Sequence, residues 1–166
     1  MNAMNKKTRK PLPYKLSLSV QYASAIPNLP TRVQFRRWIK IALQRNVQMT
    51  LRIVDEAEGR ELNRNYRGKD YATNVLTFVY DDEELLTGDA DLIYGDVIIC
   101  APVVAKEVRG QRKELWAHYA HLAIHAALHL QGYDHENAAD AAAMETLETS
   151  LMLRLSCPDP YQELKH

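Results

Sequence analysis

Four stretches of the chain have the pattern of β-strands. They cover residues 15–24, 47–55, 73–80 and 92–100. The first two alternate apolar and polar side chains, which places one kind on each face of an extended strand. In the other two, apolar residues dominate. We therefore expect a sheet of about four strands.

Helices are predicted between and after these strands, over residues 31–45, 56–66, 102–109, 111–131 and 137–155. Thr31 is a typical helix-capping residue, and four apolar residues behind it are candidate packing positions. These are Val33, Trp38, Ile41 and Leu43.

Three signals mark the ends of the later helices. Pro102 suits the first turn of a helix, where its missing N–H costs little. Gly132 is suited to end the long helix in a left-handed conformation, and Asn137 with Asp140 is typical of a helix start. This order of strands and helices predicts an α+β fold in which a small mixed sheet packs against helices.

The composition is that of one globular domain. Of the 166 residues, 46% are hydrophobic and 25% are charged, and no apolar run approaches the ~18 residues of a membrane span. The domain is expected over residues 15–160, after a flexible basic segment at 1–14 that lacks the apolar stretch of a secretory signal. Two cysteines, Cys100 and Cys157, argue against a disulfide framework; Cys100 ends an apolar run and is expected in the core. These features predict a cytoplasmic protein without a membrane partner.

Charge is unevenly distributed along the chain. Residues 1–54 hold eleven of the 21 basic residues and none of the 21 acidic ones, although the net charge is zero. Such a protein can present a basic face to a polyanion while remaining neutral overall. The charge pattern alone fits equally well a solvated helix face preceded by a basic tail.

Three histidines in the C-terminal third have the spacing of metal ligands. His125 and His129 are four residues apart, so they share one helix face and can reach a common ion. Gly132 then lets the chain turn, which can bring His135 to the same ion. Three imidazoles leave a position for water or substrate, whereas a structural zinc site usually closes all four, commonly with cysteines. The segment predicts the catalytic site of a metal-dependent hydrolase, with zinc as the first candidate and nickel, copper or iron as others.

Nearby polar residues allow more than one role. His121, one turn before His125, either supports a ligand or transfers a proton, or it lies at the edge of the core. His118 is more simply a surface or core-edge histidine. Asp134 either hydrogen-bonds a ligand or shapes the turn.

The histidine spacing occurs in the metzincin proteases, whose signature is HExxHxxGxxH. In that signature the Glu after the first His is the general base. Here that residue is Ala126, which disfavours peptide hydrolysis by that route.

Three blocks of sequence resemble the YbeY family more closely. The segment from His125 to His135, HAALHLQGYDH, resembles its HGxLHLxGxDH motif. Residues 62–78, LNRNYRGKDYATNVLTF, are similar to LNxxYRxKDxPTxVLSF, and residues 95–100, GDVIIC, resemble its GDIxI strand. The resemblance covers roughly residues 15–160. The chain departs from the pattern at three positions without losing a ligand: Ala126 for Gly, Ala72 for Pro, and Val79 where the family often has Pro.

The resemblance implies a bacterial, metal-dependent endoribonuclease that is specific for single strands and acts in ribosomal RNA maturation and ribosome quality control. It implies the ribosome or its small subunit as a partner. It also implies that Arg67 lies in the catalytic cleft, where a guanidinium can fork onto phosphate oxygens. Without the resemblance Arg67 is more simply a surface arginine at a helix end. Lys69 is either another phosphate contact or an exposed lysine.

We further predict that one helix holds the RNA backbone electrostatically, without reading its sequence. Its basic stripe consists of Arg32, Arg36, Arg37 and Lys40. Two other function classes stay open at this point: a metzincin-like metalloprotease or other zinc hydrolase, and a non-catalytic ribosome-assembly factor whose metal is structural. The open coordination position weighs against the second of these.

Overall fold

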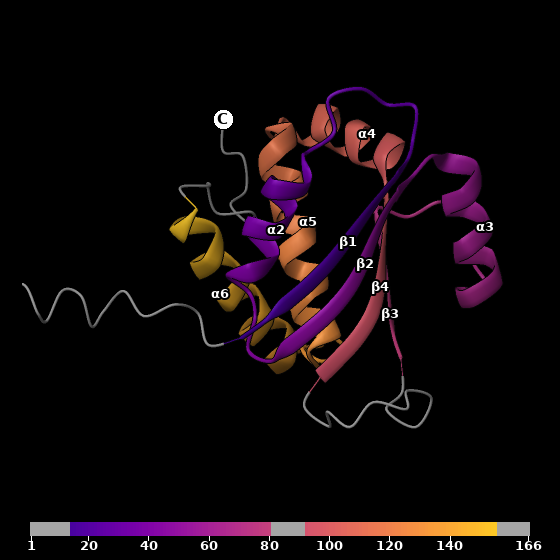
Figure 1. Cartoon of the computed structure of the whole chain (residues 1–166). Helices are drawn as coiled ribbons and strands as arrows, with labels where there is room; N and C mark the ends of the chain where they lie inside the picture. The colour runs from indigo at the N-terminus through magenta and orange to yellow at the C-terminus, as the bar shows by residue number, and fades with distance from the viewer. Residues whose placement is uncertain (1–13, 81–91, 156–166) are drawn as a thin grey trace, which may run out of the picture.

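The computed structural model describes residues 14–80 and 92–155 (Figure 1). The strands are β1 (Leu16–Ala23), β2 (Asn46–Val54), β3 (Val75–Val79) and β4 (Leu92–Cys100). The helices are α2 (Arg32–Lys40), α3 (Glu56–Arg67), α4 (Ala101–Gln111), α5 (Leu115–Leu130) and α6 (Ala138–Arg154). The basic segment expected at the N-terminus, Cys157 and the last residues of the expected domain lie outside the described residues, except for Tyr14.

The strands form one mixed sheet in the order β1-β2-β4-β3. β1 runs parallel to β2, and β2 runs parallel to β4, whereas β3 is antiparallel to β4. Parallel neighbours need a crossover connection, and α2 supplies it between β1 and β2. The predicted α+β fold with a small mixed sheet of four strands is confirmed.

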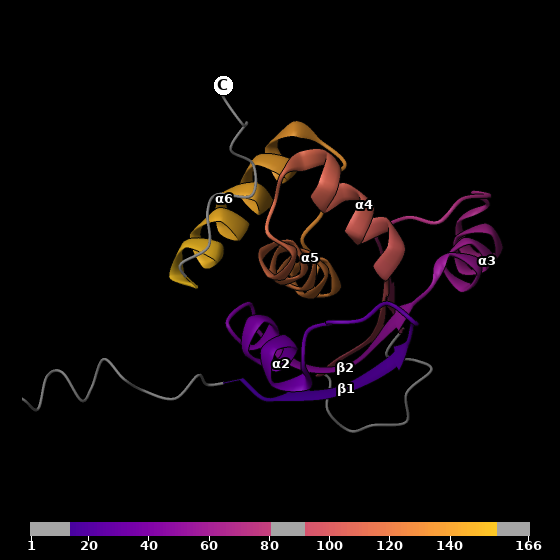
Figure 2. The ribbon, with the colours of Figure 1, turned by 90° about the horizontal axis from the view of Figure 1, so that it is seen from above.

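One face of the sheet carries most of the core. Alternate side chains of β2, from Val47 to Ile53, are buried in a cluster with residues of α2 and α5. In Figure 2, α2 and α5 lie over the sheet, with α4 and α6 beyond α5. On the other face, Leu76 and Ile98 form a smaller cluster that includes Leu62 of α3. Cys100 belongs to this second cluster and is buried, as predicted.

The central helix is α5. Twelve of its 16 residues are buried, so it has no broad solvated face, and its histidines are polar groups in an apolar setting. Its C-terminal turn packs on β4 at Gly95, where a Cβ would lie 2.5 Å from Leu130 Cδ2 and 2.9 Å from the Phe78 carbonyl oxygen. A side chain at Gly95 would push this end of the helix off the sheet. Gly95 therefore sets how closely the histidine-bearing end of α5 approaches β3 and β4.

Two helices differ in length from the prediction. Thr31 caps α2 in a capping box with Gln34, but the helix ends at Lys40 rather than near residue 45. The backbone N–H groups of Ala42 and Leu43 bond to carbonyls three residues back, at 3.0 and 3.3 Å, and this tight turn directs the chain into β2. Val33 was wrongly predicted to pack, since it is 77% exposed; the buried side chains of α2 are Phe35, Trp38 and Ile39.

The long helix α5 begins at Leu115, later than predicted. Arg112, with φ of 51°, ends α4 in a left-handed conformation, and the chain changes direction before α5 starts. None of the helices in residues 14–80 and 92–155 combines the length and apolar character needed to cross a membrane.

Candidate metal centre and its cleft

Three imidazole rings gather at the C-terminal end of α5. The rings of His125 and His129 are parallel, with centroids 6.4 Å apart. Gly132, with φ of 107°, lets the chain reverse after the helix, as predicted. The ring of His135 returns to within 5.7 Å of His125 and 6.0 Å of His129, centroid to centroid. The structure thus brings together the three residues whose spacing suggested a common ion.

The hydrogen bonds of the two helix histidines determine which ring nitrogen is available. Nδ1 of His129 lies 3.0 Å from the backbone carbonyl oxygen of Tyr133. Nδ1 of His125 makes a short hydrogen bond to Oε1 of Glu148. A carbonyl or carboxylate oxygen accepts, so Nδ1 of each ring donates and Nε2 keeps its lone pair. Both rings therefore have the tautomer that binds a metal through Nε2.

The donor set fits a zinc-type ion. Three neutral imidazoles are a common ligand set for catalytic zinc. An ion with bonds of about 2.1 Å to each ring would hold the centroids roughly 5 Å apart, so the rings need to move inward by only about an ångström. Ligand atoms of His129, Asp134 and His135 already lie within 4.8 Å of one another. Asp134 also shapes the turn, because its Oδ1 accepts from the backbone N–H of His135.

Behind the ring of His125 lies a buried carboxylate. Glu148 of α6 has no exposed surface, and its Oε2 lies 3.4 Å from Nε2 of His121. Ligand atoms of His121, His125 and Glu148 also lie within 4.8 Å of one another, so this group too could hold a metal ion. However, Nδ1 of His125 is the atom that meets Glu148. The contacts therefore favour Glu148 as the group that orients His125.

Burial favours the neutral form of His129, which is the form that a metal ligand requires. Its partial burial lowers the pKa of the imidazole, the Tyr133 carbonyl raises it in part, and neighbouring His125 lowers it again. A lowered pKa keeps the ring neutral to lower pH than an exposed histidine. The ligand nitrogen is therefore available throughout the neutral range.

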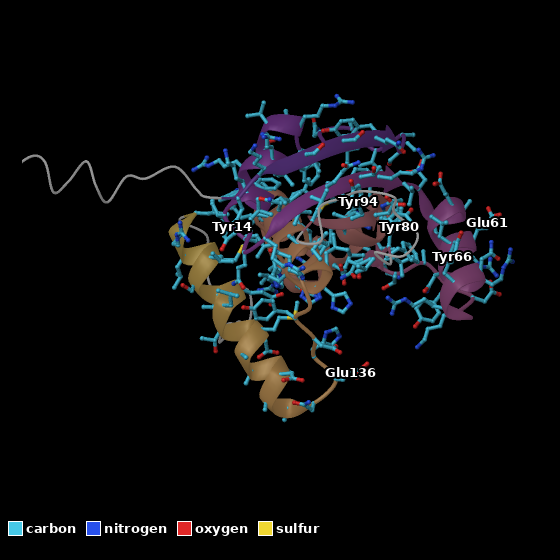
Figure 3. All side chains as sticks on the ribbon, turned by 60° about the horizontal axis from the view of Figure 1, so that its bottom comes forward. Tyr14, Glu61, Tyr66, Tyr80, Tyr94 and Glu136 are labelled. Carbon is cyan, nitrogen blue, oxygen red and sulfur yellow. The ribbon has the colours of Figure 1, made fainter. Side chains whose placement is uncertain are left out.

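The histidines open into a cleft of about 610 Å³ between α3, β3 and the end of α5. Figure 3 shows Tyr66, on α3, and Glu136, after α5, on two sides of this region. The cleft is lined by Asn63, Arg67, Lys69, Tyr71, Thr73, Asn74, Val75, Leu76, Thr77, His125, His129, Asp134, His135 and Glu136.

The loop after α3 is tied back to the helix, and this holds two cations in the cleft. Gly68, with φ of 71°, ends α3 directly after Arg67. The buried Asn63 amide donates to the Tyr71 carbonyl at 2.7 Å. Arg60 pairs with Asp70 through two hydrogen bonds of 2.9 Å. The side chains of Arg67 and Lys69 both line the cleft as a result.

Comparison with known proteins identifies the family. The family model described as "Endoribonuclease YbeY" matches residues 20–156. The chain belongs to this family. A protein of Methylobacillus flagellatus named "Endoribonuclease YbeY" is 52% identical over 151 residues, which cover 91% of this chain and 97% of that protein.

A second named relative matches this chain over a similar length. A protein of Aromatoleum aromaticum with the same name is 53% identical over 150 residues, covering 89% of this chain and 93% of its own. Among solved structures, a Thermotoga maritima protein studied in solution is 22% identical, with a TM-score of 0.48, over 88% of this chain and 99% of that one.

The basic stripe of α2 lies apart from the cleft. Arg32 donates to the Val20 carbonyl and Arg36 to the Leu16 carbonyl, each at 3.1 Å, so both side chains hold β1 at the far edge of the sheet from β3. Arg32 also lies 4.9 Å above the Tyr22 ring. Among the described residues, those that line the cleft include none from α2. An RNA contact by this stripe stays a prediction.

Sequence reasoning missed Glu148 and misjudged His118. His118 is only 5% exposed, with Nε2 3.1 Å from Oε1 of Glu107, whose carboxylate also accepts from the Asn74 amide in the cleft wall. The available signal for Glu148 was its position in the apolar stripe of the last helix, between the buried Met144 and Leu151.

Proposed function

We propose that this protein is a metal-dependent endoribonuclease that cuts single-stranded RNA. The observation that carries the proposal is one cleft lined by three imidazoles, a guanidinium and an ammonium group. Imidazoles suit a zinc-type ion, and cations suit a phosphate backbone. The names of the relatives, "Endoribonuclease YbeY", support the same substrate class.

The metal in this proposal is zinc, one ion per chain, held by His125, His129 and His135. A zinc ion held by these residues would supply a Lewis acid that polarises a phosphoryl oxygen and would lower the pKa of a water to about 7. The protein's own contribution is to fix the ligands. Glu148 and the Tyr133 carbonyl keep the two helix rings in the ligating tautomer.

Arg67 is the residue we assign to the reacting phosphate. Its planar guanidinium can donate two hydrogen bonds to the non-bridging oxygens and offset the charge that develops there. Lys69 adds a second positive charge to the same wall of the cleft. We assign His121 a positioning role through Glu148, because His121 is 9% exposed and does not line the cleft.

We also propose a place in the cell for this activity. The resemblance of the three sequence blocks supports ribosomal RNA maturation in the cytoplasm, with the ribosome or its small subunit as the partner.

Incubation of the purified protein with labelled single-stranded RNA and, separately, with casein tests the proposal. We expect RNA cleavage and intact casein, since Ala126 stands where a metzincin has its general base. His129→Ala should abolish cleavage. Arg67→Glu should reduce cleavage by about 100-fold, the usual scale for losing one transition-state donor.

Arg109→Glu is the matched control, because Arg109 is exposed on α4 and lies outside the cleft lining. It should retain most of the activity. Casein cleavage without RNA cleavage, or RNA cleavage that survives both His129→Ala and Arg67→Glu, would overturn the assignment.

A further inference from the structure

The cleft is bordered by backbone as well as by side chains, because the outer edge of β3 lies along it. In the described part of the chain, β3 is the last strand of the sheet and pairs only with β4. Its opposite edge borders the cleft, because Val75 and Thr77 line the cleft with the histidines and Arg67.

The register fixes which backbone groups point to that edge. The Cys100 N–H donates to the Asn74 carbonyl at 3.0 Å, and the Tyr80 N–H donates to the Tyr94 carbonyl at 2.9 Å. Backbone groups of successive residues alternate in direction along a strand. Since residues 74 and 80 face β4, the N–H and C=O groups of residues 75, 77 and 79 face away from it.

These outward groups are available for a ligand. Val75 and Thr77 pair with Ile99 and Val97 at positions of the antiparallel ladder that exchange no hydrogen bonds. Within residues 14–80 and 92–155, no other hydrogen bond engages their backbone groups. Both residues are partly exposed. Their outward groups repeat every two residues, about 6.8 Å apart, beside the metal centre.

We propose that the outward N–H and C=O groups of Val75 and Thr77 form a docking edge for a single RNA strand. The inference rests on the proposed function. The N–H groups can donate to phosphate or base oxygens, and the carbonyls can accept from ribose 2′-hydroxyls or base amino groups. A duplex keeps its base edges paired and stacked, so this edge favours an unpaired strand.

A peptide could add to the same edge as a further strand. The charges favour RNA, because Arg67 and Lys69 line the same cleft and complement a polyanion. Ala126, in place of the metzincin glutamate, also argues against a peptide substrate.

The sharpest test compares proline at two positions of β3. Thr77→Pro removes an N–H that faces the cleft, and Val79→Pro removes one that faces the same edge outside the cleft lining. Neither N–H belongs to the β3–β4 ladder, and proline is tolerated at such edge positions. Thr77→Val keeps the N–H and removes the hydroxyl, so the rise in KM that it causes measures the side chain and is compared with that of Thr77→Pro.

We expect Thr77→Pro to raise KM for single-stranded RNA about tenfold, the scale of one lost hydrogen bond to a charged group. Val79→Pro should change KM by less than about twofold, and Thr77→Val should raise KM less than Thr77→Pro does. All three variants should bind zinc like the wild type. Equal KM values for Thr77→Pro and Val79→Pro would overturn the docking edge while leaving the proposed function intact.

Two further outcomes are decisive. If Thr77→Pro does not fold, replacing residue 77 by its α-hydroxy analogue removes the same N–H as an ester without a ring, and the same rise in KM is expected. The second outcome is that the wild-type protein does not cleave RNA but binds an extended peptide, and that Thr77→Pro weakens this binding. In that case both the RNA edge and the proposed function are wrong.

Discussion

Each helix histidine of the candidate metal centre has one ring nitrogen engaged by the protein itself. The partner of His129 is a backbone carbonyl, which any residue at position 133 would supply. The partner of His125 is the side chain of Glu148, which a substitution can remove. A buried carboxylate that only accepts fixes the ring orientation and tautomer of its histidine. A substitution of Glu148 therefore removes the group that fixes the ring of His125, whereas no substitution at position 133 removes the carbonyl that fixes His129.

Glu148→Gln should weaken zinc binding about tenfold, the lower end of the range for groups that support a ligand. The change keeps the side-chain volume but loses the negative charge that favours an Nδ1 proton on His125. Zinc affinity measured by competition with a chromophoric chelator reports the effect.

Glu145→Gln is the matched control, since Glu145 is exposed on the same helix. It should leave affinity unchanged. Equal affinities for the two variants would show that Glu148 does not position His125.

His118 should make stability depend on pH. Burial lowers the pKa of His118 from 6.5, more than neighbouring Glu107 raises it. The unfolded chain therefore binds more protons below pH 6.5, and folding stability falls as the pH drops through 6.5 toward the lowered folded pKa; above 6.5 His118 contributes no pH dependence.

His118→Gln keeps a donor toward Glu107 and removes this titration. Chemical denaturation at about pH 7.5 and pH 5.5 should show a loss of unfolding free energy on acidification that is smaller in the variant, by at most about 1.4 kcal/mol, which is the limit for one group with an unfolded pKa of 6.5. Identical losses in the two proteins would contradict the assignment.

The candidate metal centre depends on the turn that follows α5. Gly132→Ala places a side chain on a residue with φ of 107°, which should cost about 1–3 kcal/mol of stability. The strain should also displace His135 and weaken zinc binding.

Gly110→Ala provides the comparison. Gly110 lies in α4 at an ordinary φ, and nothing lies within 4 Å of a Cβ at either glycine. This change should stabilise the protein by about 0.5–1 kcal/mol and leave zinc affinity unchanged. Thermal unfolding with and without zinc distinguishes the two, and a shift of the same sign in both variants would refute the argument.

Local signals predicted most of the elements and the histidine group. The i, i+4 spacing of His125 and His129 and the turn at Gly132 act within one short segment, so spacing was enough to bring three rings together. The end of α2 at Lys40 was missed because a tight turn, and not a helix breaker, stops it. The proximity of Arg67 to the histidines came from family resemblance alone. Glu148 escaped because its role depends on how α6 packs on α5.

Over the whole molecule, the two edges of the sheet have different characters. The cleft and its cations lie at the β3 edge, whereas the basic stripe of α2 lies at the β1 edge. Two arginines of that stripe bond to outward carbonyls of β1, which covers part of an exposed strand edge. Arg32 and Arg36 therefore have a structural use in addition to any contact with RNA.

Arg37→Glu separates these uses, because Arg37 is exposed whereas Arg36 bonds to the Leu16 carbonyl. If the stripe contacts RNA, this variant should bind RNA more weakly and lower the slope of log K against log salt by about one. Its unfolding free energy should change little. Arg36→Glu should lose stability as well. Unchanged RNA binding in both variants would limit the stripe to holding β1.

The central claim is that His125, His129 and His135 hold a metal with which this cleft cuts RNA. The most direct measurement is cleavage of labelled single-stranded RNA by chelator-stripped protein to which zinc is returned in steps. We predict that activity is absent at first and rises until about one ion per chain has been added, and that His129→Ala stays inactive throughout. Full activity in the stripped protein, or none at any level of zinc or other divalent transition metal, would contradict the account.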